Sequence, residues 1–177
     1  AVLGLNPISA GTIRLNSLVL ESKANGRTRS RIQAQMIFQD PYSSLNPRMR
    51  ALQAVCEGLL KDRSLSSVER AERGMKALRE VGLEGYEERY PHQLSGGQRQ
   101  RLCIARALIV RPKLLIADEP IAALDATIQS QILDLLSELK HAHEFTFIFL
   151  SHDLAAVRRI ADPVAVLCKG ELVECGS

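Results

Sequence analysis

The sequence has little of what marks a membrane-spanning, secreted or strongly basic protein. No stretch approaches the roughly 20 apolar residues that cross a bilayer, and even the apolar run 114–117 stops at Asp118. The first eight residues have neither the charged start nor the length of a secretion signal. The 4 cysteines include no Cys-x-x-Cys pair, which favours reduced thiols and a cytoplasmic location. A net charge of +3 is too small to predict nucleic-acid binding.

The residues that are present predict one globular α/β domain. Of the 177 residues, 46% are hydrophobic and 24% charged, a balance that supports a buried core. The polar segment 22–30, with Asn25-Gly26, is predicted to be an exposed loop. Strands are predicted at 12–20, 34–38, 113–117, 146–150, 164–167 and 171–173, and helices at 50–82, 99–110, 126–140 and 153–161. This alternation predicts a largely parallel sheet covered by helices.

Two acids follow the most apolar predicted strand. Asp118 and Glu119 come at its carboxyl end, where open α/β sheets bind ligands. In phosphate chemistry the first acid can hold Mg²⁺ through water, and the second can accept a proton from an attacking water. Taken alone, such a pair is more often a solvated loop, so the prediction depends on neighbouring motifs.

The segment Leu94–Gln98 is a candidate anion site. Gly96 and Gly97 let backbone N–H groups approach an anion, Ser95 can donate a further hydrogen bond, and the following helix adds its positive N-terminal dipole. A lone Ser-Gly-Gly is usually a flexible turn. Its position before a strand that ends in Asp-Glu makes the site more specific.

Three further polar residues complete the candidate set. His152 follows the predicted strand 146–150 and can reach the same sheet edge as the acids, although Ser151 offers a simpler role for this segment as a helix cap. Gln39 ends the strand 34–38, from which an amide can reach a metal or a water, and it is otherwise an ordinary loop residue. Asp125 most simply caps the next helix. His92, His141 and His143 are predicted to be surface residues.

Together these motifs resemble the nucleotide-binding subunits of ABC transporters. Gln39 matches the Q-loop, Leu94–Gln98 the signature motif, Leu114–Glu119 Walker B, 122–125 the D-loop and His152 the switch histidine. The resemblance implies a RecA-like P-loop NTPase core of ABC ATPase type at 1–49 and 94–177. It also implies an inserted α-helical subdomain at about 50–93.

The resemblance also implies roles, with ATP and Mg²⁺ as cofactors. Glu119 would be the general base and His152 the contact to the γ-phosphate, while Asp118 and Gln39 would be ligands of Mg²⁺ and water. The nucleotide-binding set would be Gln39, Ser95, Gly96, Gly97, Gln98 and Asp125.

Two segments narrow the resemblance to importers of dipeptides and oligopeptides. These segments are 38–49 and 117–120, and nickel importers share similar sequences there. Such a subunit would pair with a second ABC ATPase subunit, as a homodimer or heterodimer, and with transmembrane permease subunits, at the cytoplasmic face of the membrane. No nucleic-acid partner is expected.

The phosphate loop Gly-x-x-x-x-Gly-Lys-Ser/Thr occurs nowhere in the sequence. In the family it stands immediately before a segment like 1–5, so we expect an N-terminally truncated cassette that does not hydrolyse ATP alone and exposes apolar sheet surface. Its signature motif would then serve ATP bound by a partner. The alternatives are a non-catalytic or vestigial partner-binding protein, and a soluble ABC ATPase of translation or DNA repair.

Overall fold

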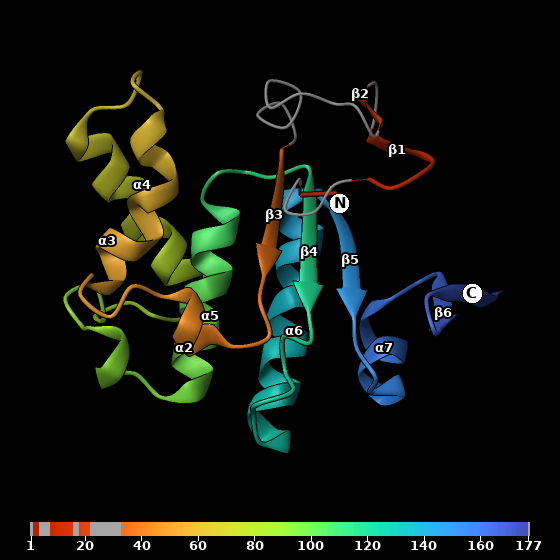
Figure 1. Cartoon of the computed structure of the whole chain (residues 1–177). Coiled ribbons are helices and arrows are strands. Elements are labelled where there is room, and N and C mark those ends of the chain that lie inside the picture. The colour runs from red at the N-terminus through yellow and green to blue at the C-terminus, as the bar shows by residue number, and fades with distance from the viewer. Residues whose placement is uncertain (1, 4–7, 16–17, 22–32, 177) are drawn as a thin grey trace.

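A three-stranded parallel sheet forms the centre of the protein (Figure 1). The computed structural model describes residues 2–3, 8–15, 18–21 and 33–176. The strands β3 (Ala34–Ile37), β4 (Leu114–Asp118) and β5 (Thr146–Leu150) lie in the order β3-β4-β5, with Ile37 beside Ala117 and Ala117 beside Phe149. The predicted parallel α/β sheet is confirmed, and the carboxyl ends of its strands meet at one edge.

Two helices bury one face of this sheet. These are α5 (Gly96–Leu108) and α6 (Ala126–His143), which contact each other and share the main core with the strands. Side chains on alternate positions of β3 and β4 point into that core, as the two-residue period of a strand requires. Fully buried side chains of the core include Ile37, Leu115, Leu102, Ile104, Ile132 and Leu136.

The opposite face of the sheet is only partly covered. Leu114 and Ile116 of β4 are buried in a small second cluster with Met36. On β5, however, Ile148 and Leu150 of the same face are 40% and 39% exposed. Apolar side chains of this sheet face are therefore exposed at β5.

The remaining helices flank the sheet, the one that follows β5 on one side and the others on the other side (Figure 1). They are α2 (Pro41–Ser44), α3 (Ala51–Cys56), the 3₁₀ helix η1 (Glu57–Lys61), α4 (Ser67–Glu80), the 3₁₀ helix η2 (Pro91–Gln93) and α7 (Leu154–Ile160). The helix predicted over 50–82 is thus three elements. The predicted capping box is present, because Ser66 Oγ accepts from the Glu69 amide at 3.2 Å and the Glu69 carboxylate accepts from the Ser66 amide at 2.8 Å. Gly82, with φ of 72°, follows the end of α4.

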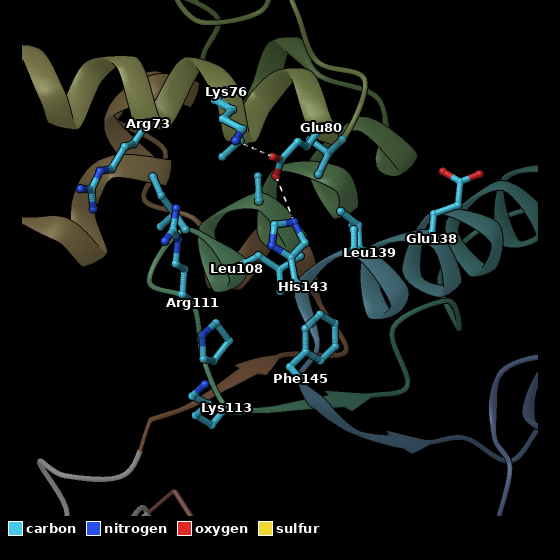
Figure 2. Close-up of a pocket in the computed structure, with 16 residues that line it drawn as sticks. Arg73, Lys76, Glu80, Leu108, Arg111, Lys113, Glu138, Leu139, His143 and Phe145 are labelled. Carbon is cyan, nitrogen blue, oxygen red and sulfur yellow. Dashed lines mark ion pairs between the residues drawn. The ribbon is translucent and has the colours of Figure 1, made fainter.

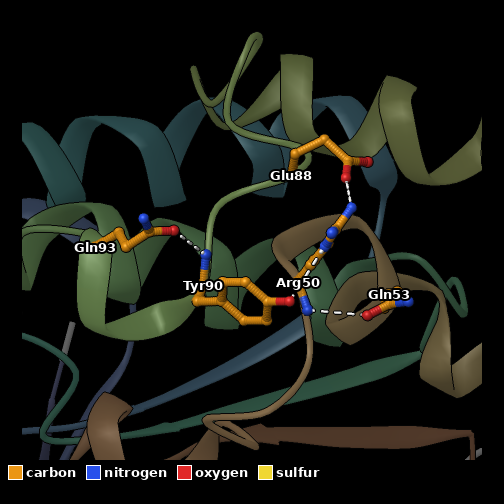
Figure 3. A network of polar contacts seen from close by, with 5 residues as sticks. All are labelled: Arg50, Gln53, Glu88, Tyr90 and Gln93. Carbon is orange, nitrogen blue, oxygen red and sulfur yellow. Dashed lines mark hydrogen bonds and ion pairs between the residues drawn. The ribbon is translucent and has the colours of Figure 1, made fainter.

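A polar network ties α3 to the segment that leads into η2 (Figure 3). The Arg50 guanidinium donates to the Glu88 carboxylate and, at 3.4 Å, to the Tyr90 hydroxyl. The Ala51 amide donates to the Arg89 carbonyl at 2.8 Å and extends the connection along the backbone. The polar segment before the signature motif is therefore anchored at several points.

Two antiparallel hairpins complete the described fold. β1 (Thr12–Leu15) pairs with β2 (Leu18–Glu21), and β6 (Val164–Cys168) pairs with β7 (Glu171–Gly176). The prediction of one strand over 12–20 was wrong, because Asn and Ser, which favour turns, interrupt its alternation at 16–17. The loop predicted at 22–30 lies outside the described residues.

Three smaller predictions can also be compared with the structure. All 4 cysteines are free thiols, as predicted. His92 and His141 are exposed, whereas His143 is half-buried beside Glu80, so its prediction as a surface residue was wrong. In the part of the chain that the structure describes, no helix has the length and apolarity to cross a membrane.

Candidate active site

Four of the predicted site residues lie at the carboxyl edge of the sheet. We call Gln39, Asp118, Glu119 and His152 the strand-end cluster. Gln39 comes shortly after β3, Asp118 ends β4, Glu119 follows it, and His152 comes shortly after β5. Because the three strands are parallel neighbours, the sheet brings these residues to one edge.

Glu119 and His152 are in direct contact. The Glu119 carboxylate lies 2.6 Å from His152 Nδ1 and accepts from the His152 backbone amide at 3.0 Å. The Glu119 amide donates to the Leu150 carbonyl at 3.0 Å, and Glu119 has a left-handed φ of 47°. The chain therefore turns sharply at the end of β4 and aims the carboxylate at the end of β5.

The contact has a clear electrostatic consequence. The hydrogen bond that the Glu119 carboxylate accepts, and then its negative charge, raise the pKa of His152 above its usual value. The side chain of His152 is 82% exposed and that of Glu119 only 20%. With Nδ1 beside the carboxylate, Nε2 is left to face an anion in solvent, while Glu119 retains a carboxylate that can accept a proton.

Asp118 and Gln39 are the oxygen donors of the cluster. Asp118 is half-buried and Gln39 is exposed, and neither side chain has a hydrogen-bond partner among the described residues. Mg²⁺ in phosphate sites is commonly held by one or two protein oxygens, with phosphate and water supplying the rest. The donor set of these two residues fits such a cation. The described residues contain no group of three or more His, Cys, Asp or Glu side chains that could hold a metal by themselves.

The segment Leu94–Gln98, which we call the signature segment, forms the N-terminus of α5. Ser95 is the N-cap, and its Oγ accepts from the Gln98 amide at 3.3 Å while Gln98 Oε1 accepts from the Ser95 amide at 2.9 Å. This capping box starts the helix at Gly96, three residues before the predicted start at Arg99. The Ser95 hydroxyl is exposed and its own hydrogen is still available to a ligand.

The two glycines of this segment pack against the start of α6. A Cβ on Gly97 would lie 2.6 Å from Ile128 Cγ2, closer than side chains tolerate, and a Cβ on Gly96 would lie 3.4 Å from Leu124 Cδ2. Gly97 is therefore required by packing, a role that the sequence analysis missed. The signature segment and the turn before α6 form one surface.

Asp125 caps α6, as its simplest interpretation predicted. Its Oδ1 accepts from the Ile128 amide at 3.1 Å. Gln129 also holds this turn, because its Nε2 donates to the carbonyls of Ile121 at 3.2 Å and Leu124 at 3.1 Å. The sequence analysis did not single out Gln129.

A second set of contacts joins α5 to α2, which follows Gln39. Arg99 lies over the Tyr42 ring, 5.5 Å from its centroid, and Ser44 Oγ lies 3.2 Å from Cys103 Sγ. Arg106 donates to the Ser44 carbonyl. Tyr42 and Ser44 lie in the segment 38–49 that the resemblance singled out, but nothing in the sequence identified residues of α5 as their neighbours. These contacts fix the segment after Gln39 against α5.

Comparison with known proteins identifies the family. The family model described as ABC transporter matches residues 1–122. This chain belongs to the ABC transporter family. Solved ABC ATPase structures share its fold, so the predicted RecA-like P-loop architecture is confirmed. One, of cbiO1 from Clostridium perfringens, part of the transporter complex cbiONQ, is 30% identical with a TM-score of 0.89 and is matched over 99% of this chain and 69% of its own.

A second structural neighbour was solved with ligands. The dimeric ATP-binding cassette MJ0796, in a post-hydrolysis state with ADP and Pi, is 28% identical with a TM-score of 0.84, matched over 99% of this chain and 76% of its own. Membership of the ABC ATPase family therefore implies nucleotide binding.

Curated relatives of this ABC family member are named as peptide transporters. The di/tripeptide transport ATP-binding protein DppF of Pseudomonas aeruginosa is 42% identical over 95% of this chain and 53% of its own length. The oligopeptide transport ATP-binding protein AmiF of Streptococcus pneumoniae is 45% identical over 98% of this chain and 58% of its own. The chain thus spans little more than half the length of these relatives.

Proposed function

We propose that this chain is part of the ATP-binding, ATP-hydrolysing subunit of an ABC importer for peptides. The observation that carries the proposal is the Glu119–His152 pair at the sheet edge, with Asp118 at the end of the central strand. The names of the relatives DppF and AmiF support peptides as the cargo. Such a subunit works at the cytoplasmic face of the membrane, attached to permease subunits.

In this proposal each residue of the strand-end cluster has one task. Glu119 accepts a proton from the water that attacks the γ-phosphate, and His152 donates from Nε2 to that phosphate. Asp118 and Gln39 would hold Mg²⁺, which when bound offsets phosphate charge. Because the Glu119 carboxylate is four-fifths buried and held by two hydrogen bonds, it is positioned before any ligand arrives.

We further propose two parts within the chain. Residues 1–49 and 94–177 would form the catalytic core, and about 50–93 would form a helical subdomain that docks on the permease. The grouping of α3, η1 and α4 to one side of the sheet supports this division (Figure 1). The contacts of Arg50 would then transmit movement of this subdomain to the segment that immediately precedes the signature motif (Figure 3).

The signature segment would act on ATP held by a second ABC ATPase subunit. Ser95, Gly96, Gly97 and Gln98 present a helix N-terminus to that nucleotide, with Asp125 at the same surface. The exposed Ser95 hydroxyl supports this interpretation, because its capping bond uses only a lone pair.

Ser95→Asp tests the proposal without removing the helix cap. Asp and Ser cap helices about equally well, but Asp brings a negative charge against phosphate. The chain is added to an intact peptide-importer ATPase subunit that carries a phosphate loop, and ATP affinity and hydrolysis are measured. We expect the unmodified chain to raise the ATP affinity of the partner subunit. With Ser95→Asp this affinity should be at least about five-fold lower than with the unmodified chain, because one unit of repulsive charge near 4 Å costs about 1 kcal/mol in water.

Ser66→Asp is the matched control, because Ser66 caps α4 in the same capping-box geometry. It should leave the gain unchanged. If the unmodified chain binds the partner but changes neither ATP affinity nor hydrolysis, the proposal fails and a non-catalytic partner-binding protein is favoured. Equal losses with both variants would assign the effect to folding and would also refute the role of Ser95.

A further inference from the structure

A cavity of about 660 Å³ lies at the edge of the sheet opposite the strand-end cluster. Lys113 and Phe145, which line it, immediately precede β4 and β5, whereas Glu119 and His152 follow these strands. The cavity is open to solvent and is bounded by α4, the ends of α5 and α6, and the turn between α5 and β4 (Figure 2). Its volume is within the range of about 300–1,000 Å³ that is usual for small-molecule sites.

The floor of the cavity is apolar. It is formed by side chains that pack into the main core from four elements or their ends. These are Ala77, Val81, Ala105, Leu108, Leu139 and Phe145, all buried. A floor of this kind favours the ring or short hydrocarbon body of a ligand over water.

The walls of the cavity carry an excess of positive charge. Arg73, Lys76, Arg111 and Lys113 line it, and among the described residues only Lys76 of these four forms an ion pair, 3.9 Å from Glu80. Two carboxylates also line it, those of Glu80 and Glu138. The fixed charges therefore leave a surplus of two positive charges.

Among the described residues, these carboxylates form an ion pair with Lys76 and with none of the other three cationic side chains. The Glu80 carboxylate lies between Lys76 and His143, 3.3 Å from His143 Nε2. Figure 2 shows Glu138 directed away from Arg111 and Lys113. The ends of α5 and α6 add about half a negative charge each, which still leaves the walls positive.

The backbone holds two of the cationic residues in place. Arg111 has a left-handed φ of 51°, and its amide donates to the Leu108 carbonyl at 2.8 Å. The Lys113 amide donates to the Gln33 carbonyl at 2.7 Å, and its own carbonyl accepts from the Thr146 amide at 2.9 Å. The backbone of both residues is held by these hydrogen bonds, so ligand binding has little backbone conformational entropy to remove.

We propose that this cavity binds a small organic anion, a phosphate or carboxylate on an apolar body of about one ring, at a site separate from the one proposed for ATP. The anionic group faces Arg73, Arg111 and Lys113; the guanidinium groups of the two arginines match phosphate and carboxylate oxygens, and the lysine ammonium adds a further positive charge. The apolar body lies on the floor formed by Leu139 and Phe145.

The test is a titration of the 177-residue chain followed by amide NMR. Phenyl phosphate and phenylacetate supply both halves of the ligand, inorganic phosphate only the charge, and benzyl alcohol only the ring. We expect saturable shifts at the amides of Ala77, Ala105 and Phe145 with phenyl phosphate or phenylacetate. Benzyl alcohol should bind at least about five-fold more weakly, the value of one close charge contact in a water-like medium. Inorganic phosphate should also bind at least about five-fold more weakly, because it has no ring to bury on the apolar floor.

Charge variants give the sharper comparison. Arg111→Gln and Lys113→Gln should each weaken binding about five-fold, and Glu80→Gln should tighten it by a similar factor. Arg63→Gln, at an exposed arginine outside the cavity, should leave binding unchanged. Tighter binding after Glu80→Gln is the decisive result, because a change that merely loosened the structure would not produce it.

Four results would overturn the proposal. They are an absence of saturable shifts, inorganic phosphate binding as tightly as phenyl phosphate, equal losses from Arg63→Gln and Arg111→Gln, and shifts centred on Ile148 and Leu150 of the exposed sheet face. None of them depends on ATP, so the site stands or falls separately from the proposed ATPase function. Phenyl phosphate and phenylacetate also distinguish a phosphate ligand from a carboxylate ligand.

Discussion

Adding one methyl group at Gly97 should destabilise the protein, although the same change at Gly96 should not. The new Cβ at 97 would lie 2.6 Å from Ile128 Cγ2, whereas ordinary van der Waals contact begins at 3.4 Å. Ile128 is β-branched and in the first turn of α6, so its side chain cannot rotate away freely. The overlap must then be relieved by separating α5 from α6.

The magnitude follows from two opposing effects. Overpacking of a well-packed contact costs about 1–3 kcal/mol, and replacing a helical Gly by Ala returns about 0.5–1 kcal/mol. Gly97→Ala should therefore lower the free energy of unfolding by about 1–2 kcal/mol, or about 2–8 °C in Tm for a chain of this size. Gly96→Ala meets only the flexible end of Leu124 at 3.4 Å and should be neutral or slightly stabilising.

Urea unfolding followed by circular dichroism measures both variants, with an unchanged m-value as the check on two-state behaviour. In an Ile128→Ala background the offending Cγ2 is gone. The penalty for Gly97→Ala should then shrink by at least about 1 kcal/mol, the coupling energy of a direct contact. Equal effects at Gly96 and Gly97, or a penalty that persists in the Ile128→Ala background, would refute the packing argument.

Two further predictions concern titration and thiol reactivity. Glu119→Gln should lower the pKa of His152 in an NMR titration, because the hydrogen bond to Glu119 and its negative charge raise this pKa. The pair of Glu119 and protonated His152 therefore stabilises the fold at low pH. This stabilisation disappears as the pH rises through the raised pKa of His152. An unchanged His152 titration would show that the pair does not persist in solution. Burial raises the pKa of the Cys103 thiol, so iodoacetamide with mass spectrometry should modify exposed Cys168 and Cys175 first, and early labelling of Cys103 would contradict the buried α5 packing.

The sequence predicted elements well where one face carries the hydrophobic signal. The strand before Asp118 and the apolar face of α6, with Ile132 and Leu136, are found close to where periodicity places them. The start of α5 was placed too late, although Ser95 and Gln98 have the same spacing as Ser66 and Glu69. The glycines between them suggested a loop, and the capping box prevails over their low helix propensity.

Contacts between distant segments could not be predicted in this way. Nothing in the sequence near Gly97 says that Ile128 will press against it, and nothing near Tyr42 identifies Arg99 as its neighbour. These contacts follow from how α5 packs on α2 and α6, which depends on the whole core. The half-buried position of His143 beside Glu80 could not be predicted either, because a polar residue at a helix end is usually exposed.

The part of the candidate site that sheet topology determines was predicted from the sequence. Parallel strands required Glu119 and His152 to share an edge, and the structure has them in contact. Topology does not determine the left-handed backbone of Glu119, which aims its carboxylate. The tasks proposed for these residues remain predictions.

The backbone conformation of Glu119 opposes the stability of the fold to the activity proposed for this residue. A left-handed φ of 47° is unfavourable for any residue with a Cβ, by about 1 kcal/mol, and costs glycine nothing. Glu119→Gly would release that strain and also the cost of ordering a long side chain. At a pH above the raised pKa of His152, where the pair with Glu119 no longer stabilises the fold, a library of variants sorted only for resistance to unfolding would therefore enrich glycine at this position, whereas one sorted for phosphate chemistry would retain the acid. Comparing the two enrichments would measure how much stability the protein gives up to hold this carboxylate.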